Sequence, residues 1–107
     1  MVSDLTVAKK MLQIKKSGDE RGISFDLSFA ETKKLLTSKY CFFTKVELNE
    51  IDQDPNKRSF DRIDNTKGYI NGNVVACTTI FNQRKGNITI EDIKLLYKLF
   101  KRRNLIN

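Results

Sequence analysis

The 107-residue sequence contains no histidine. This absence excludes every mechanism in which an imidazole ring acts as a general base or as a metal ligand. Proline occurs once, at Pro55, within a polar stretch over residues 49–58 that predicts a surface loop. The two cysteines, Cys41 and Cys77, form no CxxC pair. A reduced chain is therefore the simpler interpretation, while a disulfide between them stays open.

Long hydrophobic runs are also missing. No apolar stretch approaches the ~18 residues that a membrane-spanning helix requires. Residues 1–20 lack the uninterrupted apolar segment of a secretory signal. We therefore expect a cytoplasmic protein with no membrane partner. Hydrophobic residues make up 39% of the chain and charged residues 31%, which suits one globular domain of common size rather than a disordered tail.

Acidic residues are outnumbered by basic ones. The chain has 20 Lys and Arg against 13 Asp and Glu, which gives a formal net charge of +7. A positive charge of this size on a small chain favours a polyanionic partner, and nucleic acid is the commonest one. The alternative is a basic, solvated surface that has no partner at all.

Apolar residues at helical spacing predict helices over residues 4–16, 28–38 and 90–103. The first of these helices is expected to end at Ser17 and Gly18, because glycine commonly follows the last helical turn. No repeat and no change of composition divides the chain, so the three helices are expected to belong to one domain.

The second and third predicted helices carry recognisable start signals. Ser28 and Glu31 form a capping box at the start of the second helix, which is expected to bury Phe29, Leu35 and Leu36. Thr89 caps the third helix. Its apolar stripe consists of Ile93, Leu96, Tyr97 and Phe100.

Residues 59–86 form the most informative block, SFDRIDNTKGYINGNVVACTTIFNQRKG. The pattern predicts a strand over 59–63, a turning segment over 65–73, and a returning strand over 74–77. A short helix follows, capped by Thr78 or Thr79 and ended by Gly86. The block therefore predicts a hairpin with a helix packed across it.

This hairpin and helix can bring two oxygen-bearing side chains together. Asp61 lies on the first strand and Asn82 on the short helix. A carboxylate and an amide oxygen are the hard ligands that Mg²⁺ prefers, and Mg²⁺ needs few protein ligands because it keeps several waters. Lys85 lies three residues after Asn82 and so shares its helix face, where it could touch a phosphate. The alternative is that Asp61 is an ordinary acid paired with a neighbouring cation.

The pattern D-R-I-D-N-x-K-G-Y-x-x-G-N-V over 61–74, followed by Asn82 and Lys85, resembles the HNH endonuclease family. The similarity is greatest to small phage and bacterial members, and it is tight over residues 59–86. It implies a ββα-metal finger in which Asp61 and Asn82 bind one Mg²⁺ or Mn²⁺. It also implies that Asn73 holds the loop through backbone hydrogen bonds.

The chain departs from that family at two places. The family's general-base histidine corresponds to Arg62, which stays protonated and cannot accept a proton. Arg62 could instead hold a phosphate in a bidentate contact, and Asp64 is a weak substitute for the base. The positions of a second CxxC pair hold Thr78 and Phe81, so we expect no structural zinc.

The sequence therefore predicts a single α+β domain: N-terminal helices and a connecting loop over 1–58, an HNH-like ββα finger over 59–86, and a C-terminal helix over 87–107. The expected function is metal-dependent cutting or nicking of nucleic acid, with duplex DNA as the expected substrate, in a phage-infected or bacterial cell. Catalytic roles fall on Asp61, Arg62 and Asn82, and backbone contacts on Arg62, Lys67, Arg84 and Lys85.

Two alternatives remain. The first is a catalytically deficient finger that survives as a nucleic-acid-binding or protein-binding module of a phage. The second is a protein that binds an acidic protein partner, in which case binding would persist at high salt. The pattern leaves open whether one strand or two is cut, whether DNA or RNA is preferred, and whether the chain self-associates.

Overall fold

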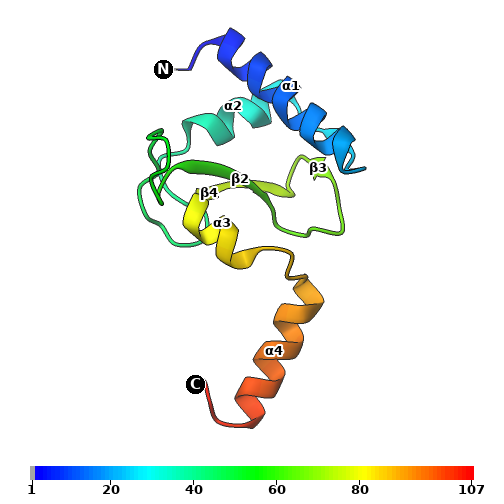
Figure 1. The fold of residues 1–107 in the computed structure, drawn as a ribbon, viewed down its shortest axis with the longest axis vertical. Helices are drawn as coiled ribbons and strands as arrows, with labels where there is room; N and C mark the ends of the chain where they lie inside the picture. The colour runs from blue at the N-terminus through cyan, green and yellow to red at the C-terminus, as the bar shows by residue number, and fades with distance from the viewer. Residues whose placement is uncertain (1) are drawn as a thin grey trace.

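The computed structural model describes residues 2–107, which form a single small α+β domain. In chain order its elements are α1 (Asp4–Glu20), β1 (Phe25–Asp26), α2 (Phe29–Thr37), β2 (Arg58–Arg62), β3 (Tyr69–Ile70), β4 (Val74–Thr78), α3 (Thr79–Lys85) and α4 (Ile90–Arg102). Figure 1 shows α1 and α2 on one side of the strands, α3 on the other, and α4 standing away from them.

The centre of the domain is an antiparallel hairpin of β2 and β4, with Asp61 opposite Val75. All five residues of β4 are buried, because this strand is covered on both faces. A second pair, β1 and β3, is parallel, with Phe25 opposite Tyr69. The predicted strand, turn, strand and helix of residues 59–86 are thus present, and the turning segment contains β3.

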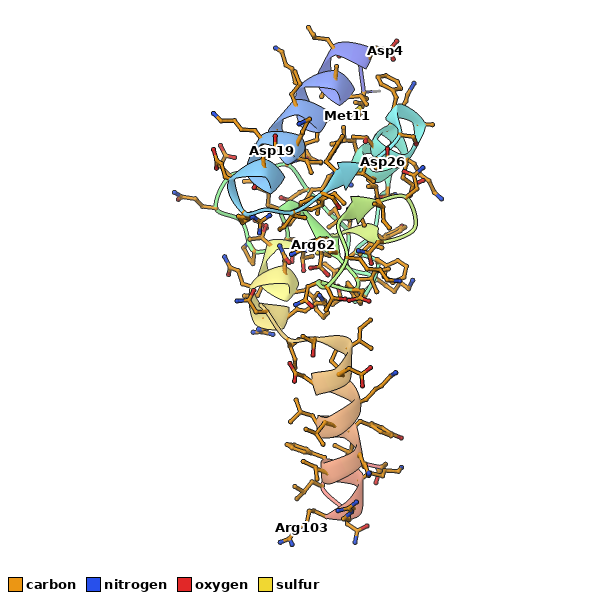
Figure 2. The ribbon with its side chains drawn as sticks, turned by 90° about the vertical axis from the view of Figure 1, so that its right-hand side faces the viewer. Asp4, Met11, Asp19, Asp26, Arg62 and Arg103 are labelled. Atoms are coloured by element: carbon orange, nitrogen blue, oxygen red, sulfur yellow. The ribbon has the colours of Figure 1, made fainter. Side chains whose placement is uncertain are left out.

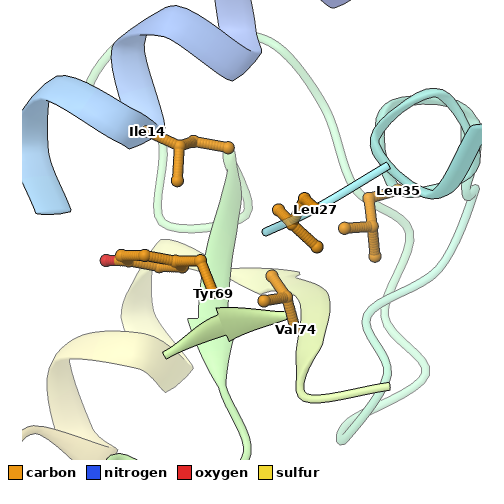
Figure 3. Close-up of a cluster of buried hydrophobic side chains, with 5 residues drawn as sticks. All are labelled: Ile14, Leu27, Leu35, Tyr69 and Val74. Carbon is orange, nitrogen blue, oxygen red and sulfur yellow. The ribbon is translucent and has the colours of Figure 1, made fainter. Parts of the chain in front are cut away.

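The core has two parts, one on each side of the hairpin. Figure 3 shows the first, in which Ile14 of α1, Leu35 of α2 and Tyr69 of β3 meet Leu27 and Val74. The second part gathers around the two thiols and lies next to α3; its members are Cys41, Leu48, Ala76 and Cys77, with Phe43 and Phe81 packed against them. The hairpin is therefore held from both sides, which fixes the strand that carries Asp61.

The predicted end of the first helix is wrong, because α1 continues through Gly18 to Glu20. A Cβ added at Gly18 would lie 2.8 Å from the Ile23 carbonyl oxygen and 3.5 Å from the Tyr69 ring. Gly18 thus permits a close approach inside the helix and does not stop it. The chain turns at Gly22, whose φ of 68° is one that glycine adopts without strain.

The second helix starts where predicted but packs differently. The Ser28 hydroxyl accepts from the Glu31 amide at 3.1 Å, whereas the Ser28 amide donates to the Asn71 side chain at 3.0 Å. The prediction that Phe29 is buried is wrong, since 41% of this residue is exposed. The burial of Leu35 is confirmed, Leu36 is half-buried, and Thr32 joins Leu35 on the buried side of α2, because these positions face α1 and β4.

Helix α4 begins at the predicted cap and has a full capping box, formed by Thr89 and Asp92. No residue of α4 is buried among those that the structure describes. Figures 1 and 2 show it projecting from the domain. The Cα radius of gyration is 15.4 Å, compared with about 13 Å for a compact domain of this length. None of the helices within residues 2–107 is long and apolar enough to cross a membrane.

Candidate functional site

Asp61 and Asn82 line the same small cavity, although 21 residues separate them in the chain. The cavity has a volume of about 230 Å³ and a largely polar lining, to which Asn65 also contributes. Asp61 reaches it from β2, and Asn82 reaches it from α3 because that helix packs across the hairpin. The remaining lining residues are Arg21, Phe60, Arg62, Tyr69, Gly86 and Asn87.

Asp61 forms a buried ion pair with Lys85. The Lys85 ammonium lies 3.1 Å from Asp61 Oδ2 and 3.4 Å from Oδ1, and it donates to the Arg62 carbonyl oxygen at 3.0 Å. The side chains are only 7% and 9% exposed, for Lys85 and Asp61 respectively. The ammonium therefore faces the carboxylate rather than the solvent, and it supplies the positive charge that a buried carboxylate requires.

Two residues that line the cavity each have a buried side-chain oxygen that makes no directed hydrogen bond within residues 2–107: Asp61 Oδ2 and Asn65 Oδ1. Asp61 Oδ2 is within charge contact of Lys85, but the geometry is not that of a hydrogen bond. The Asn65 amide nitrogen donates to the Asn87 and Ile88 carbonyls at 3.0 and 3.2 Å, which fixes how the amide is turned. Buried oxygens without donors are costly unless a cation or water meets them.

Asn82 is held by a hydrogen bond from its side-chain nitrogen to the Ser59 hydroxyl at 2.8 Å. The side-chain nitrogen of Asn82 is thereby directed to β2, and its side-chain oxygen is not used in this bond. Asp61, Asn65 and Asn82 together bring one carboxylate and two amide side chains to one cavity. This set of hard ligands fits a divalent cation such as Mg²⁺ or Mn²⁺. No group of three or more His, Cys, Asp or Glu side chains that could hold a metal ion gathers in the described part of the chain, so an ion in this cavity would have Asp61 as its one carboxylate ligand.

Asn73 ties the loop between β2 and β4 together. Its side-chain nitrogen donates to the Asp64 and Gly68 carbonyls, each at 3.0 Å, and its side-chain oxygen accepts from the Asp64 amide at 2.9 Å. Asn73 is itself buried. These bonds hold the loop from which Asn65 reaches the cavity.

Arg62, which the HNH resemblance would put at the position of a general base, is engaged in the same loop. Its Nη1 donates to the Asn65 and Lys67 carbonyls at 3.0 and 2.9 Å, and its guanidinium carbon lies 5.4 Å from the centre of the Tyr69 ring. Figure 2 labels Arg62 beside α3. The guanidinium thus stabilises the loop and leaves a positive charge at the cavity wall.

Arg21 is a second cation at this cavity, which the sequence analysis did not identify as a site residue. It hydrogen-bonds the Tyr69 hydroxyl, and its guanidinium carbon lies 5.9 Å from the ring. The sequence gives one indication of this role, which is that Arg21 directly follows the first helix and precedes Gly22. Lys67 and Arg84, predicted to contact nucleic acid, are exposed and lie outside the cavity lining.

Asp64, which was predicted as a weak substitute for a base, does not line the cavity. Its Oδ1 accepts from the Thr66 hydroxyl at 2.6 Å and from the Thr66 amide at 3.0 Å. The hydrogen bond from the Thr66 side chain, followed by that from its amide, lowers the pKa of Asp64. A lowered pKa makes this carboxylate a weaker proton acceptor.

The two cysteines are free and buried. Burial raises the pKa of Cys77 to about 12, so this thiol stays protonated near neutral pH and does not offer the thiolate that a soft metal needs. Both residues belong to the core beside α3.

Comparison with known proteins yields little about function. No protein-family model matches the chain, and no solved structure matches it. The chain is 30% identical over 88 residues to a protein of Enterobacteria phage T4, the uncharacterized 29.0 kDa protein in the dda-modA intergenic region. The match covers 81% of this chain and 35% of the phage protein, so the chain spans about a third of that relative's length.

Proposed function

We propose that the chain acts on nucleic acid as an HNH-like endonuclease, with one divalent cation held between β2 and α3. One observation carries this proposal: Asp61 and Asn82 both line a single polar cavity, and one buried oxygen of Asp61 makes no directed hydrogen bond. Asn65 lines the same cavity and has a second buried oxygen without a hydrogen-bond donor. The net charge of +7 favours a polyanionic substrate.

The bound cation would supply charge stabilisation at the scissile phosphate and at the leaving oxygen. The part of the protein's own side chains is to hold the cation and to orient the phosphate. Arg21 and Arg62 put two positive charges at the cavity wall, where they can attract a phosphate oxygen. Because Arg62 cannot accept a proton, no side chain at this position activates the attacking water. We therefore expect slow cleavage, since a general base typically contributes ~10²–10⁴-fold in rate.

Lys85 sets the condition for binding the cation. Its ammonium lies 3.1 Å from Asp61 Oδ2, and two cations cannot share one buried carboxylate at that range without strong repulsion. The Lys85 side chain must therefore leave Asp61 when a divalent ion binds. Lys85 is then free to meet the phosphate from the same side of α3.

A plasmid-nicking assay tests the enzyme proposal. The full chain is incubated with supercoiled plasmid in Mg²⁺ or Mn²⁺, with EDTA and with the Asp61→Ala variant as controls. We expect relaxed plasmid only with the wild type and a divalent cation. Absence of nicking across both cations and a range of pH would exclude the endonuclease.

The second candidate is a finger that binds nucleic acid without cutting it. The observation in its favour is the same ion pair, because Lys85 already neutralises Asp61 while Arg62 replaces the base. DNA binding in EDTA that weakens steeply with salt, together with no nicking, would support this candidate. Binding of an acidic protein that persists at high salt would instead support a protein-binding role.

A further inference from the structure

A groove between α1 and β2 adjoins the candidate cavity. It has a volume of about 490 Å³ and shares three lining residues with the cavity: Arg21, Phe60 and Tyr69. A hydrogen bond also joins the two, because the Asn82 side-chain nitrogen, at the cavity, donates to the Ser59 hydroxyl, at the groove. A ligand that extends from the cavity along α1 therefore enters this second site, which we call the α1 groove.

The α1 groove is basic. Its lining includes four cations, Lys10, Arg21, Lys57 and Arg58, and no Asp or Glu of the described residues 2–107. Lys57 and Arg58 each pair with a carboxylate outside the lining, at 2.5 and 2.7 Å. Lys10 and Arg21 form no ion pair with any residue that the structure describes. Two uncompensated positive charges thus line one groove, which favours an anionic ligand.

The Lys10 side chain is half-buried against β2. Its ammonium lies 5.0 Å from the centre of the Phe60 ring and donates to the Gln13 side chain at 3.2 Å. Burial, followed by the neighbouring charge of Lys57, lowers the pKa of Lys10, although the charge of Glu50 acts in the opposite direction. The charged form of Lys10 is thus penalised in the free protein, and an anion in the groove would relieve this penalty.

Helical spacing brings the groove-lining residues of α1 to one face. Lys10, Gln13, Ile14 and Ser17 follow one another at intervals of three, one and three residues, and Arg21 comes four residues after Ser17. Residues at these intervals share one side of a helix. Ile14 is buried in the core, as Figure 3 shows, while its polar neighbours line the groove. Lysine, arginine, glutamine and serine are side chains that contact phosphate oxygens in complexes with nucleic acid.

We propose that the α1 groove binds the phosphate backbone of the nucleic acid next to the phosphate at the candidate cavity. This inference rests on the proposed function for the identity of its ligand, because the groove adjoins the cavity in which a phosphate would be cut. Arg21 lines both sites and contacts the backbone at their junction, and Lys10 contacts the next phosphate along the groove. Because these contacts are to the backbone, the groove positions the strand and does not read its sequence.

Binding of a labelled duplex DNA oligonucleotide to the full chain in EDTA, followed by fluorescence anisotropy over a series of salt concentrations, tests the groove. Lys10→Gln should weaken binding roughly threefold to tenfold, between the effect of an exposed ion pair and that of a charge-assisted hydrogen bond. It should also reduce the slope of log affinity against log salt by about 1, which corresponds to one lost phosphate contact.

Lys16→Gln is the matched control for Lys10→Gln. It removes the same charge from an exposed residue outside the lining, about 120° around the same helix, so the salt slope should not change. Equal losses in the two variants would show that net charge alone drives binding and would overturn the proposal. Unchanged binding of Lys10→Gln would overturn it as well.

Ser17→Glu separates a lost contact from a lost fold. It puts a negative charge into the groove lining, four residues before Arg21, a spacing at which Glu and Arg stabilise a helix. It should weaken binding at least as much as Lys10→Gln without lowering the melting temperature, and binding equal to that of the wild type would contradict the proposal. Poly-glutamate should compete poorly with the oligonucleotide. Competition as effective as that of unlabelled DNA at equal charge would overturn the phosphate assignment in favour of an acidic protein.

Failure of the groove and failure of the enzyme are distinguishable. Binding that depends on Lys10, with no nicking in Mg²⁺ or Mn²⁺, would exclude the endonuclease and leave the groove in place. Nicking with a KM that Lys10→Gln leaves unchanged would exclude the groove and leave the enzyme. If both proposals hold, Lys10→Gln should raise KM and change kcat little, because Lys10 binds the substrate away from the reacting phosphate.

Discussion

Replacing Lys85 with methionine removes the ammonium but keeps much of the side chain's volume. Asp61 then stays buried without its counterion, since its side chain is only 9% exposed. Removing one partner of a buried ion pair typically costs 3–5 kcal/mol. We take the lower end, about 3 kcal/mol, because the cavity beside Asp61 can admit water. For a domain of this size the melting temperature should fall by roughly 12–24 °C.

A divalent cation should reverse this loss in Lys85→Met. A ligand that binds only the folded state at 100 times its dissociation constant adds about 2.7 kcal/mol, which is close to the expected deficit. Mn²⁺ should therefore restore most of the melting temperature of Lys85→Met, as measured by differential scanning calorimetry. The wild type should respond less, because the ion has to displace the ammonium first.

The double variant Asp61→Asn with Lys85→Met is the control for this experiment. It lacks both charges, so it should be more stable in EDTA than Lys85→Met alone and should not respond to Mn²⁺. If Mn²⁺ leaves the melting temperature of Lys85→Met unchanged, the reasoning is refuted, since the freed carboxylate then holds no cation. An equal rise in melting temperature in the double variant would also refute the reasoning, because the Asp61 carboxylate would then not be what binds Mn²⁺.

Three other predictions concern the scaffold. Gly18→Ala should destabilise the fold by ~1–3 kcal/mol through its contact with Ile23, while the exposed Ser17→Ala changes little in denaturant unfolding. Because the pKa of Asp64 is lowered in the folded state, the ionised side chain stabilises the fold at pH values above its ordinary pKa of 3.8. This contribution to the free energy of unfolding is lost as the pH falls through the folded-state pKa. Thr66→Val should move that pKa back toward 3.8 in an NMR titration, and an unchanged pKa would count against the hydrogen bond. Cys77 should resist alkylation at mildly alkaline pH until the chain is unfolded, since its pKa is raised to about 12; rapid labelling of the native chain would contradict this.

Most of the secondary structure follows from local signals. Thr78 and Thr89 cap their helices, and Gly86 follows the last residue of α3, as their side-chain chemistry predicts. The end of α1 was predicted wrongly because glycine serves two purposes that look alike in a sequence. The local pattern favours a helix stop at Gly18, whereas the close approach of the Ile23 carbonyl oxygen requires a residue without a Cβ at this position.

The site was only partly predictable for a similar reason. The spacing of Asn82 and Lys85 indicates that they share a helix face, but not that the ammonium reaches Asp61. That contact depends on how α3 crosses the hairpin, which the apolar pattern does not specify. Arg21 was not identified, because it reaches the cavity only through the packing of α1 on Tyr69.

Diffraction from crystals soaked in Mn²⁺, with the ion located by its anomalous signal, tests the central claim most directly. We predict one peak in the cavity, in contact with the Asp61 carboxylate and the Asn82 carbonyl oxygen, with the Lys85 ammonium moved away from Asp61. An empty cavity with Lys85 still paired to Asp61, at a concentration where the ion occupies other sites, would contradict the account.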